Sequence, residues 1–103
     1  MEFKEGDYVS FKGNAIKIYG YICRVNDDNT IDYIRDSLTR WNVGKFMINN
    51  GEVITEDEFI SKVQYKANKS DQKIPTPEEI LTVLNMYKTN FDVDMSEIIS
   101  VLK

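Results

Sequence analysis

The sequence predicts an α+β fold with a β-rich first half and a helical second half. Up to residue 54, apolar residues alternate with polar ones in short runs that Asn, Asp and Gly turn signals separate. From residue 55 onward, apolar residues recur with helical spacing behind three capping patterns. The length of 103 residues fits one domain rather than two independent ones.

The first two predicted strands flank the turn signal Lys12-Gly13-Asn14. The first covers Asp7 to Phe11, and the second is a long β-prone run from Ala15 to Val25 with Gly20 in its middle. The apolar residues before and after Gly20 have opposite parity; they are Ile16 and Ile18, then Tyr21, Cys23 and Val25. Because glycine often marks a bulge or bend in a strand, we expect one at Gly20 that turns both sets toward the core.

Three further strands complete five in the predicted sheet. Their turn signals are an Asn/Asp cluster over 26–29, Gly44, and Asn49-Asn50-Gly51. The strands are predicted over Thr30 to Arg35, Ser37 to Val43 and Glu52 to Ile54, and Lys45 to Ile48 follows Gly44.

The second half begins with a helix and ends with an αα-hairpin. Thr55 with Glu58 is a capping-box pattern, followed by the apolar stripe Phe59, Ile60, Val63 and Ala67. Residues 68–75 are polar and are predicted to be a hinge. Thr76-Pro77-Glu78-Glu79 and Asp94 with Glu97 then start two more helices, so residues 76–103 form a helical hairpin packed on the same domain.

The opening of the chain carries a resemblance to a known fold. Glu5-Gly6-Asp7-Tyr8-Val9, Lys12-Gly13 and Gly20-Tyr21-Ile22, followed by an Asp/Asn turn and a further strand, resemble the small SH3-like barrels over residues 5–54. The resemblance implies a five-stranded SH3-like antiparallel barrel, so that residues 1–67 form a β-barrel with a trailing helix. Because unrelated functions share such barrels, the resemblance concerns the fold alone.

The residue types argue against catalysis. The chain has no His and one Cys, which excludes histidine-based acid–base and nucleophilic systems and cysteine-rich metal sites. Cys23 has core-facing parity and is expected to be a buried apolar side chain. No phosphate-binding glycine motif is present, and the acids over 27–32 lack the Gly and Glu of a calcium loop. We therefore expect no enzyme, no cofactor and no metal.

The charge and the hydropathy of the chain limit the kinds of partner and the cellular location that we expect for this protein. The net charge is −4, with −1 on residues 1–54 and −3 on residues 55–103, and there is no run of Lys or Arg. No apolar stretch approaches the roughly 20 residues that span a bilayer, and Met1 to Glu5 lack the apolar run of a secretory signal. We therefore expect a cytoplasmic protein that is not bound to membrane.

The C-terminal hairpin is the leading candidate for a binding surface. Its short sequence holds more apolar residues than a hairpin of this length can bury between its own two helices. They either pack on the barrel and on the preceding helix, or form a groove for a partner or for self-association as a homodimer. The candidate protein-binding residues are Leu84, Met86, Tyr87, Met95, Ile98 and Leu102.

The alternative is a nucleic-acid-binding barrel. Basic and aromatic residues interleave in the first half, as single-stranded nucleic acid requires. The residues that this alternative selects are Lys17, Tyr19, Arg40 and Trp41. Neighbouring acids nearly balance the bases, however, and a barrel of this size needs about half of its aromatic residues for its core.

The leading hypothesis is a non-catalytic protein-binding module that occupies a surface on a larger protein. Ten Lys, nine Asn and twelve Ile against three Arg and two Pro indicate AT-rich coding, which fits low-GC bacteria and their phages. A concrete version is a phage or mobile-element inhibitor or adaptor, for example an anti-defence protein of the anti-CRISPR kind. If the gene belongs to a phage, the expected location is the cytoplasm of the host cell.

Overall fold

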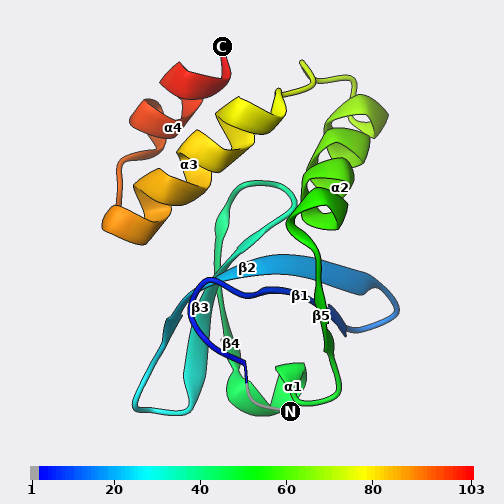
Figure 1. Cartoon of the computed structure of the whole chain (residues 1–103), viewed down its shortest axis with the longest axis vertical. Helices are drawn as coiled ribbons and strands as arrows, with labels where there is room; N and C mark the ends of the chain where they lie inside the picture. The colour runs from blue at the N-terminus through cyan, green and yellow to red at the C-terminus, as the bar shows by residue number, and fades with distance from the viewer. Residues whose placement is uncertain (1–2) are drawn as a thin grey trace.

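The computed structural model describes residues 3–103 and shows the α+β fold that the sequence predicts. Figure 1 shows the longer helices at one end of the molecule, the sheet beneath them, and a short helix at the opposite end. The strands are β1 (Tyr8–Lys12), β2 (Lys17–Val25), β3 (Thr30–Arg35), β4 (Arg40–Gly44) and β5 (Glu52–Ile54). The helices are α1 (Lys45–Ile48), α2 (Glu56–Lys69), α3 (Pro77–Thr89) and α4 (Met95–Leu102).

The five strands form one antiparallel sheet in the order β4-β3-β2-β1-β5. The first four strands are a meander, and β5 returns to pair with β1 after the chain has passed through α1. Strands β4 and β5 are the edges, and within residues 3–103 they are not paired with each other. The five-stranded antiparallel sheet is therefore confirmed, whereas a closed barrel is not shown.

Both faces of the sheet are covered, so that the small domain has two cores. The helix-side core joins the upper face to α2, α3 and α4; its buried members from the sheet half are Tyr21, Cys23, Ile34, Leu38 and Ile54. The far-side core lies on the other face of the sheet and includes Ile48 of α1. Its members are Phe3, Val9, Phe11, Ile22, Ile31, Tyr33 and Ile48.

The two cores explain why the apolar residues before and after Gly20 have opposite parity. The prediction of a bulge at Gly20 is wrong. The register shift in β2 lies between Ile22 and Arg24, whereas Gly20 keeps regular pairing with Val9 and Arg35. Tyr21 enters the helix-side core and Ile22 the far-side core, so neighbouring residues of β2 are buried on opposite faces. A long strand buried on both sides needs no bend to hide all of its apolar residues.

Gly20 serves a different purpose, because the ring of Tyr33 lies over it. A Cβ atom at this position would stand 2.7 Å from Cδ2 of Tyr33, closer than such atoms approach. Ile16, which we grouped with the core residues, lies outside β2 and is 54% exposed.

Two other segments differ from their predicted form. Residues 37–39 form a turn instead of extending β4, because Leu38 has a positive φ of 60° and the Arg35 amide donates to the Thr39 carbonyl. Leu38 is nevertheless buried in the helix-side core. Residues 45–48, which the sequence left without an assigned type, form α1.

The predicted helix starts are confirmed. The Thr55 hydroxyl accepts a hydrogen bond from the Glu58 amide, and Thr76 and Glu79 form a reciprocal capping box. Asp94 caps α4 through the Ser96 amide. Helix α2 extends to Lys69, two residues into the segment predicted as a hinge.

Two arginines tie the α3–α4 connection to the sheet. Arg40 donates through Nη1 to the carbonyls of Phe91, at 3.2 Å, and Val93, at 2.6 Å. Arg24 lies 4.7 Å from the centre of the Phe91 ring and forms an ion pair with the buried Asp32 at 3.0 Å. The helical hairpin is thus held by polar contacts as well as by the helix-side core.

Candidate functional site

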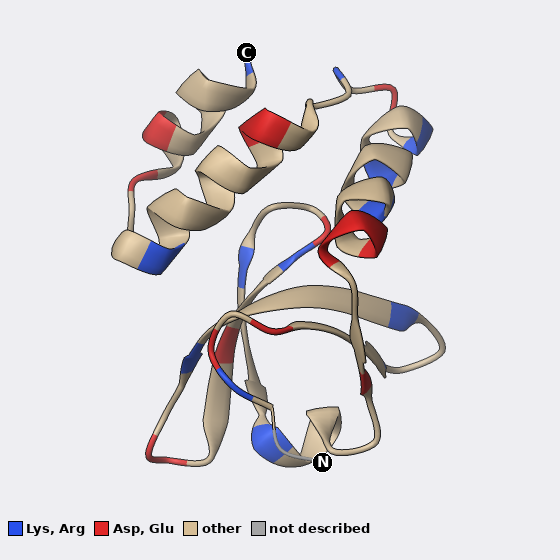
Figure 2. Cartoon of the chain, viewed as in Figure 1, with Lys and Arg blue, Asp and Glu red and all other residues tan. Residues whose placement is uncertain are grey.

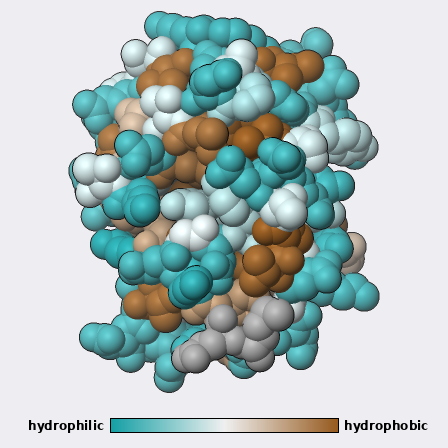
Figure 3. Space-filling view, viewed as in Figure 1, coloured by the Kyte–Doolittle hydropathy of each residue, from teal (hydrophilic) through white to brown (hydrophobic). Residues whose placement is uncertain are grey.

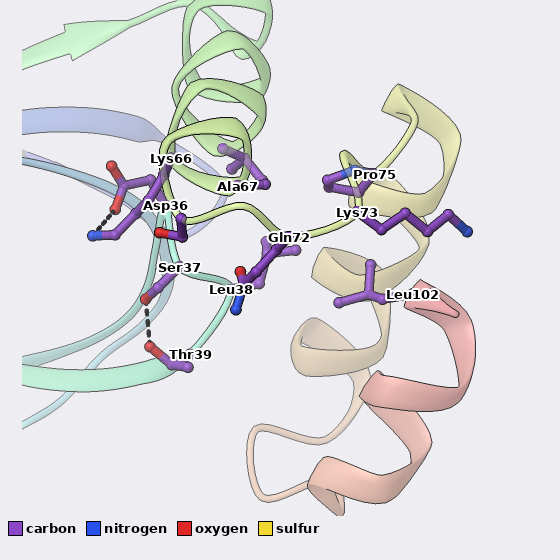
Figure 4. A pocket seen from close by; sticks show the side chains of 12 residues that line it. Asp36, Ser37, Leu38, Thr39, Lys66, Ala67, Gln72, Lys73, Pro75 and Leu102 are labelled. Carbon is purple, nitrogen blue, oxygen red and sulfur yellow. Dashed lines mark hydrogen bonds and ion pairs between the residues drawn. The ribbon is translucent and has the colours of Figure 1, made fainter.

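A partly enclosed hollow lies between α2, the β3–β4 turn and the end of α4. Its volume is about 350 Å³, and Figure 4 shows side chains from four separate segments converging on it. We call it the α2–α4 cleft. Its lining residues are Asp36, Ser37, Leu38, Thr39, Val63, Lys66, Ala67, Ser70, Gln72, Lys73, Pro75 and Leu102.

The floor of the cleft is the β3–β4 turn. Its position is set from below, because the Leu38 side chain is buried and the Leu38 carbonyl accepts a hydrogen bond of 2.9 Å from the Tyr87 hydroxyl. The Ser37 and Thr39 hydroxyls lie 2.6 Å apart, and Thr39 also accepts from the Trp41 indole nitrogen at 2.9 Å. The turn is therefore held by α3 on one side and by Trp41 on the other.

The α2–α3 connection, predicted as a polar hinge, forms one wall. The backbone amide of Gln72 donates to the Ala67 carbonyl. The side-chain amide of Gln64 donates to the carbonyl of the buried Pro75. These bonds fix both ends of the connection against α2. Ile74 lies between two lining residues and is 46% exposed.

The charges of the cleft are balanced within the chain. Lys66 forms an ion pair with Asp36 at 3.2 Å, and Lys73 forms one with Glu79 at 3.7 Å. The Thr76 backbone amide, which donates to the Glu79 carboxylate, is the main cause that lowers the pKa of that group, and Lys73 adds to it. A cleft without excess charge offers little to a phosphate or to a free cation, and it suits a partner with mixed polar and apolar chemistry.

The apolar side of the cleft belongs to α4. Leu102 reaches it from the last turn of that helix, as Figure 4 shows. Ile99 lies one turn earlier, where residues three apart are neighbours on a helix surface, and it is 52% exposed. Figure 3 shows apolar side chains gathered over the helical end of the molecule, interrupted by hydrophilic ones.

Most residues that the sequence selected for protein binding are in the interior. Leu84, Tyr87 and Ile98 are at most 3% exposed and belong to the helix-side core. Met86 and Met95 are partly buried and pack against the same core. Of the six, Leu102 alone lines the cleft. The hairpin therefore hides its main stripe against the sheet, and its exposed apolar residues are Leu81 and Ile99.

The sequence missed the remaining cleft residues because they come from segments far apart in the chain. Asp36 and Lys66, for example, are 30 residues apart and meet through the packing of α2 on the sheet. One local signal existed: Leu38 is the single apolar residue in a polar turn, which suggests that something covers that turn.

The four residues of the nucleic-acid alternative do not form one surface. Lys17 and Lys62 both lie over the Tyr19 ring beside α2, and Lys17 pairs with Glu52. Arg40 is committed to the carbonyls of the α3–α4 connection. Trp41 is 45% exposed with the Arg35 guanidinium 4.6 Å from its ring centre. Figure 2 shows basic and acidic residues interspersed over both halves.

The described residues were considered for a metal site and for an activated thiol. Residues 3–103 contain no cluster of acidic or cysteine side chains arranged to hold a metal ion. Cys23 is buried, and burial together with the nearby Asp32 carboxylate raises the pKa of its thiol to about 12. The thiol therefore stays protonated near neutral pH and is a poor nucleophile.

The comparisons with known proteins leave the family open. No protein-family model matches the chain, and neither a curated protein nor a solved structure shows a significant match. Within residues 3–103, each helix is too short or too polar to cross a bilayer.

Proposed function

We propose that this protein is a non-catalytic binding module that engages a larger protein through the α2–α4 cleft. The observation that carries the proposal is the composition of the cleft. Leu102 forms an apolar wall, the exposed Ile99 lies one helical turn before it, and the two neighbouring ion pairs balance the charges around the cleft.

Protein interfaces combine an apolar centre with a polar rim, and this cleft has both. Hydrogen-bonding groups that line the cleft with Leu102 come from the hydroxyls of Ser37 and Thr39 and from the side-chain amide of Gln72. A volume of about 350 Å³ is at the small end of ligand pockets, so it suits one or two inserted side chains of a partner.

The barrel assignment belongs to the same proposal. The strand order β4-β3-β2-β1-β5, with short α1 between β4 and β5, supports an SH3-like barrel, since that fold is a meander whose last strand returns to the first. The version in which the module is a phage-encoded or mobile-element inhibitor rests on the AT-rich composition and stays a prediction.

The test compares two identical substitutions at equally exposed residues. Ile99→Asp places a charge beside the cleft, and Ile16→Asp places one in the β1–β2 turn; the two side chains are 52% and 54% exposed. The tagged full-length chain is used to capture partners from a lysate of a low-GC bacterium, with and without nuclease, at rising salt. We expect a protein that survives nuclease and salt, is retained by Ile16→Asp, and is recovered at least about tenfold less with Ile99→Asp.

Two results would contradict the proposal. Recovery that disappears with nuclease or moderate salt would favour the nucleic-acid alternative, because phosphate contacts weaken steeply with ionic strength. Equal recovery with both variants would exclude the cleft as the contact surface.

A further inference from the structure

We propose that the free edge of β4 pairs with β4 of a second copy of this chain, giving a symmetric dimer with a continuous antiparallel sheet. The proposal is independent of the α2–α4 cleft. It rests on the backbone groups that the β3–β4 ladder leaves unpaired, on the absence of protection at this edge, and on the self-complementary order of the side chains along it.

The hydrogen-bonding phase of the β3–β4 ladder is set at its two ends. The Arg35 amide donates to the Thr39 carbonyl at 3.1 Å, and the Lys45 amide donates to the Asn29 carbonyl at 2.7 Å. Both are hydrogen-bonded positions, and these alternate with non-bonded ones along an antiparallel pair.

Alternation places Arg40, Asn42 and Gly44 at the non-bonded positions, opposite Ile34, Asp32 and Thr30. Their N–H and C=O groups point away from β3. Strand β3 is the sole strand partner of β4 within residues 3–103, and no turn or loop amide in that range bonds to these groups. Three N–H donors and the carbonyls of Arg40 and Asn42 are therefore free along this edge, whereas the carbonyl of Gly44, the N-cap of α1, accepts the first bond of that helix.

This edge lacks the features that usually prevent pairing with another chain. Strand β4 has no Pro and no bulge, and its ladder with β3 runs in register over all five residues. Its one charged side chain, Arg40, is turned to the α3–α4 connection. The opposite edge is different, because β5 has three residues and begins with Glu52.

A two-fold axis at Asn42 makes the edge complementary to itself. Asn42 then faces Asn42 of the second copy, and Arg40 faces Gly44, so the two Arg40 side chains lie at opposite ends of the strand pair. Trp41, which is 45% exposed, faces Val43 on the far side of the sheet and gains an apolar cross-strand neighbour. Such a self-complementary patch is what a two-fold dimer requires, and it favours a second copy over an unrelated extended peptide.

The first test measures molecular mass by light scattering at rising concentration for the full chain and two variants. Asn42→Ala removes the hydrogen bond of 2.8 Å that the side chain donates to Asp32 and keeps the outward N–H. Asn42→Pro also removes that N–H, which β3 does not use. We expect twice the chain mass of 12.0 kDa for the wild type and for Asn42→Ala. For Asn42→Pro we expect the dimer dissociation constant to rise at least about tenfold.

The second test does not depend on how Asn42→Pro folds. In the proposed register the two Cα atoms of residue 42 are about 5.5 Å apart, which suits a disulfide. Asn42→Cys should therefore cross-link under mild oxidation, whereas Asn85→Cys, on the exposed face of α3, should not. Cys23 does not compete because it is buried.

Three outcomes would overturn the proposal. They are a wild type that stays monomeric up to about millimolar concentration, a mass above two chains, and equal cross-linking of Asn42→Cys and Asn85→Cys. Circular dichroism of each variant shows whether a loss of dimer comes from a loss of fold; if Asn42→Pro is unfolded, the cysteine pair decides.

Discussion

The sheet and the helical hairpin differ in how many of their faces are covered. The sheet is buried on both sides, with Tyr21 in the helix-side core and Ile22 in the far-side core. The hairpin hides Leu84 and Ile98 against the sheet and leaves Leu81 and Ile99 exposed on its outside. The sheet therefore presents little beyond its edges, whereas the hairpin retains part of a face, and the two proposed contact surfaces lie in those two places.

The two regions share the helix-side core, which takes residues from the sheet and from the hairpin. If this core couples the two regions, the sheet and the hairpin unfold as one unit. A substitution in the shared core tests this coupling, and substitutions outside it act on one region.

Phe59→Ala is expected to have the largest effect. The side chain is fully buried between α2 and the sheet, and its ring centre lies 5.4 Å from that of Tyr8. Its removal should lower the free energy of unfolding by about 3–5 kcal/mol. Chemical denaturation followed by Trp41 fluorescence, which reports the sheet, and by far-ultraviolet circular dichroism, which reports the helices, should show one shifted midpoint. Two separate midpoints would contradict the coupling.

Arg40→Ala should cost about 1.5–3 kcal/mol, because it leaves the Phe91 and Val93 carbonyls without their charged donor. Hydrogen exchange should show the largest increase in α4, with little change in β1 and β2. The matched control is Arg40→Lys, which keeps the charge but not the forked donor and should recover part of the loss. Uniform acceleration across both regions would show that Arg40 does not act on the hairpin in particular.

Thr76→Ala tests the helical region alone and should cost about 1 kcal/mol, since it removes the hydroxyl that accepts from the Glu79 amide and keeps the backbone amide that donates to the Glu79 carboxylate. Thr55→Ala is its control at the start of α2, where the cap is a single hydrogen bond from the Glu58 amide. Because each substitution removes one bond between a threonine hydroxyl and a helix amide, thermal denaturation should show similar losses for the two. A clearly smaller loss for Thr76→Ala would show that the remaining bond from the backbone amide of residue 76 to the Glu79 carboxylate holds this helix start by itself.

Raising the pH from 7 to 9 should have the smallest effect. Burial raises the pKa of Cys23 to about 12 from its usual value of 9.0, so the folded chain keeps a proton that the unfolded chain loses. Stability is therefore complete below pH 9 and falls as the pH rises toward 12. At pH 9, where half of the unfolded thiols are ionised, the loss from Cys23 is about 0.4 kcal/mol.

Urea midpoints between pH 7 and pH 9 measure this loss. Cys23→Ala should show a shallower decline than the wild type. The decline should not vanish, because burial also raises the pKa of Tyr21, Tyr33 and Tyr87. A wild-type midpoint that does not change with pH would contradict the raised pKa values.

Local chemistry predicted much of the fold. The caps at Thr55, Thr76 and Asp94 and the turn at 26–29 act through neighbours within a few residues, so their sequence signals were sufficient. The bulge was predicted at Gly20 and lies beside Cys23 instead. The change of parity that suggested a bulge at Gly20 follows from the burial of both faces of β2, and the parity of one strand does not reveal whether its second face is covered.

The candidate site was predicted far less well. Helical spacing showed that Leu84 and Ile98 share an apolar stripe, but it does not show whether that stripe meets solvent or the sheet. Arg40 and Trp41 are adjacent in sequence and opposite in role, because β-strand neighbours point to opposite faces.

The sequence by itself determined the five strands and the three longer helices, their order, the helix caps and the absence of histidine chemistry. Each of these depends on residue types or on contacts within one turn. The tertiary structure alone decided that the sheet has two covered faces, that Leu38, Lys66 and Leu102 meet in one cleft, and that β4 keeps a free edge. These features depend on the packing of segments that are distant in the chain, and packing selects among arrangements that the local pattern leaves equally allowed.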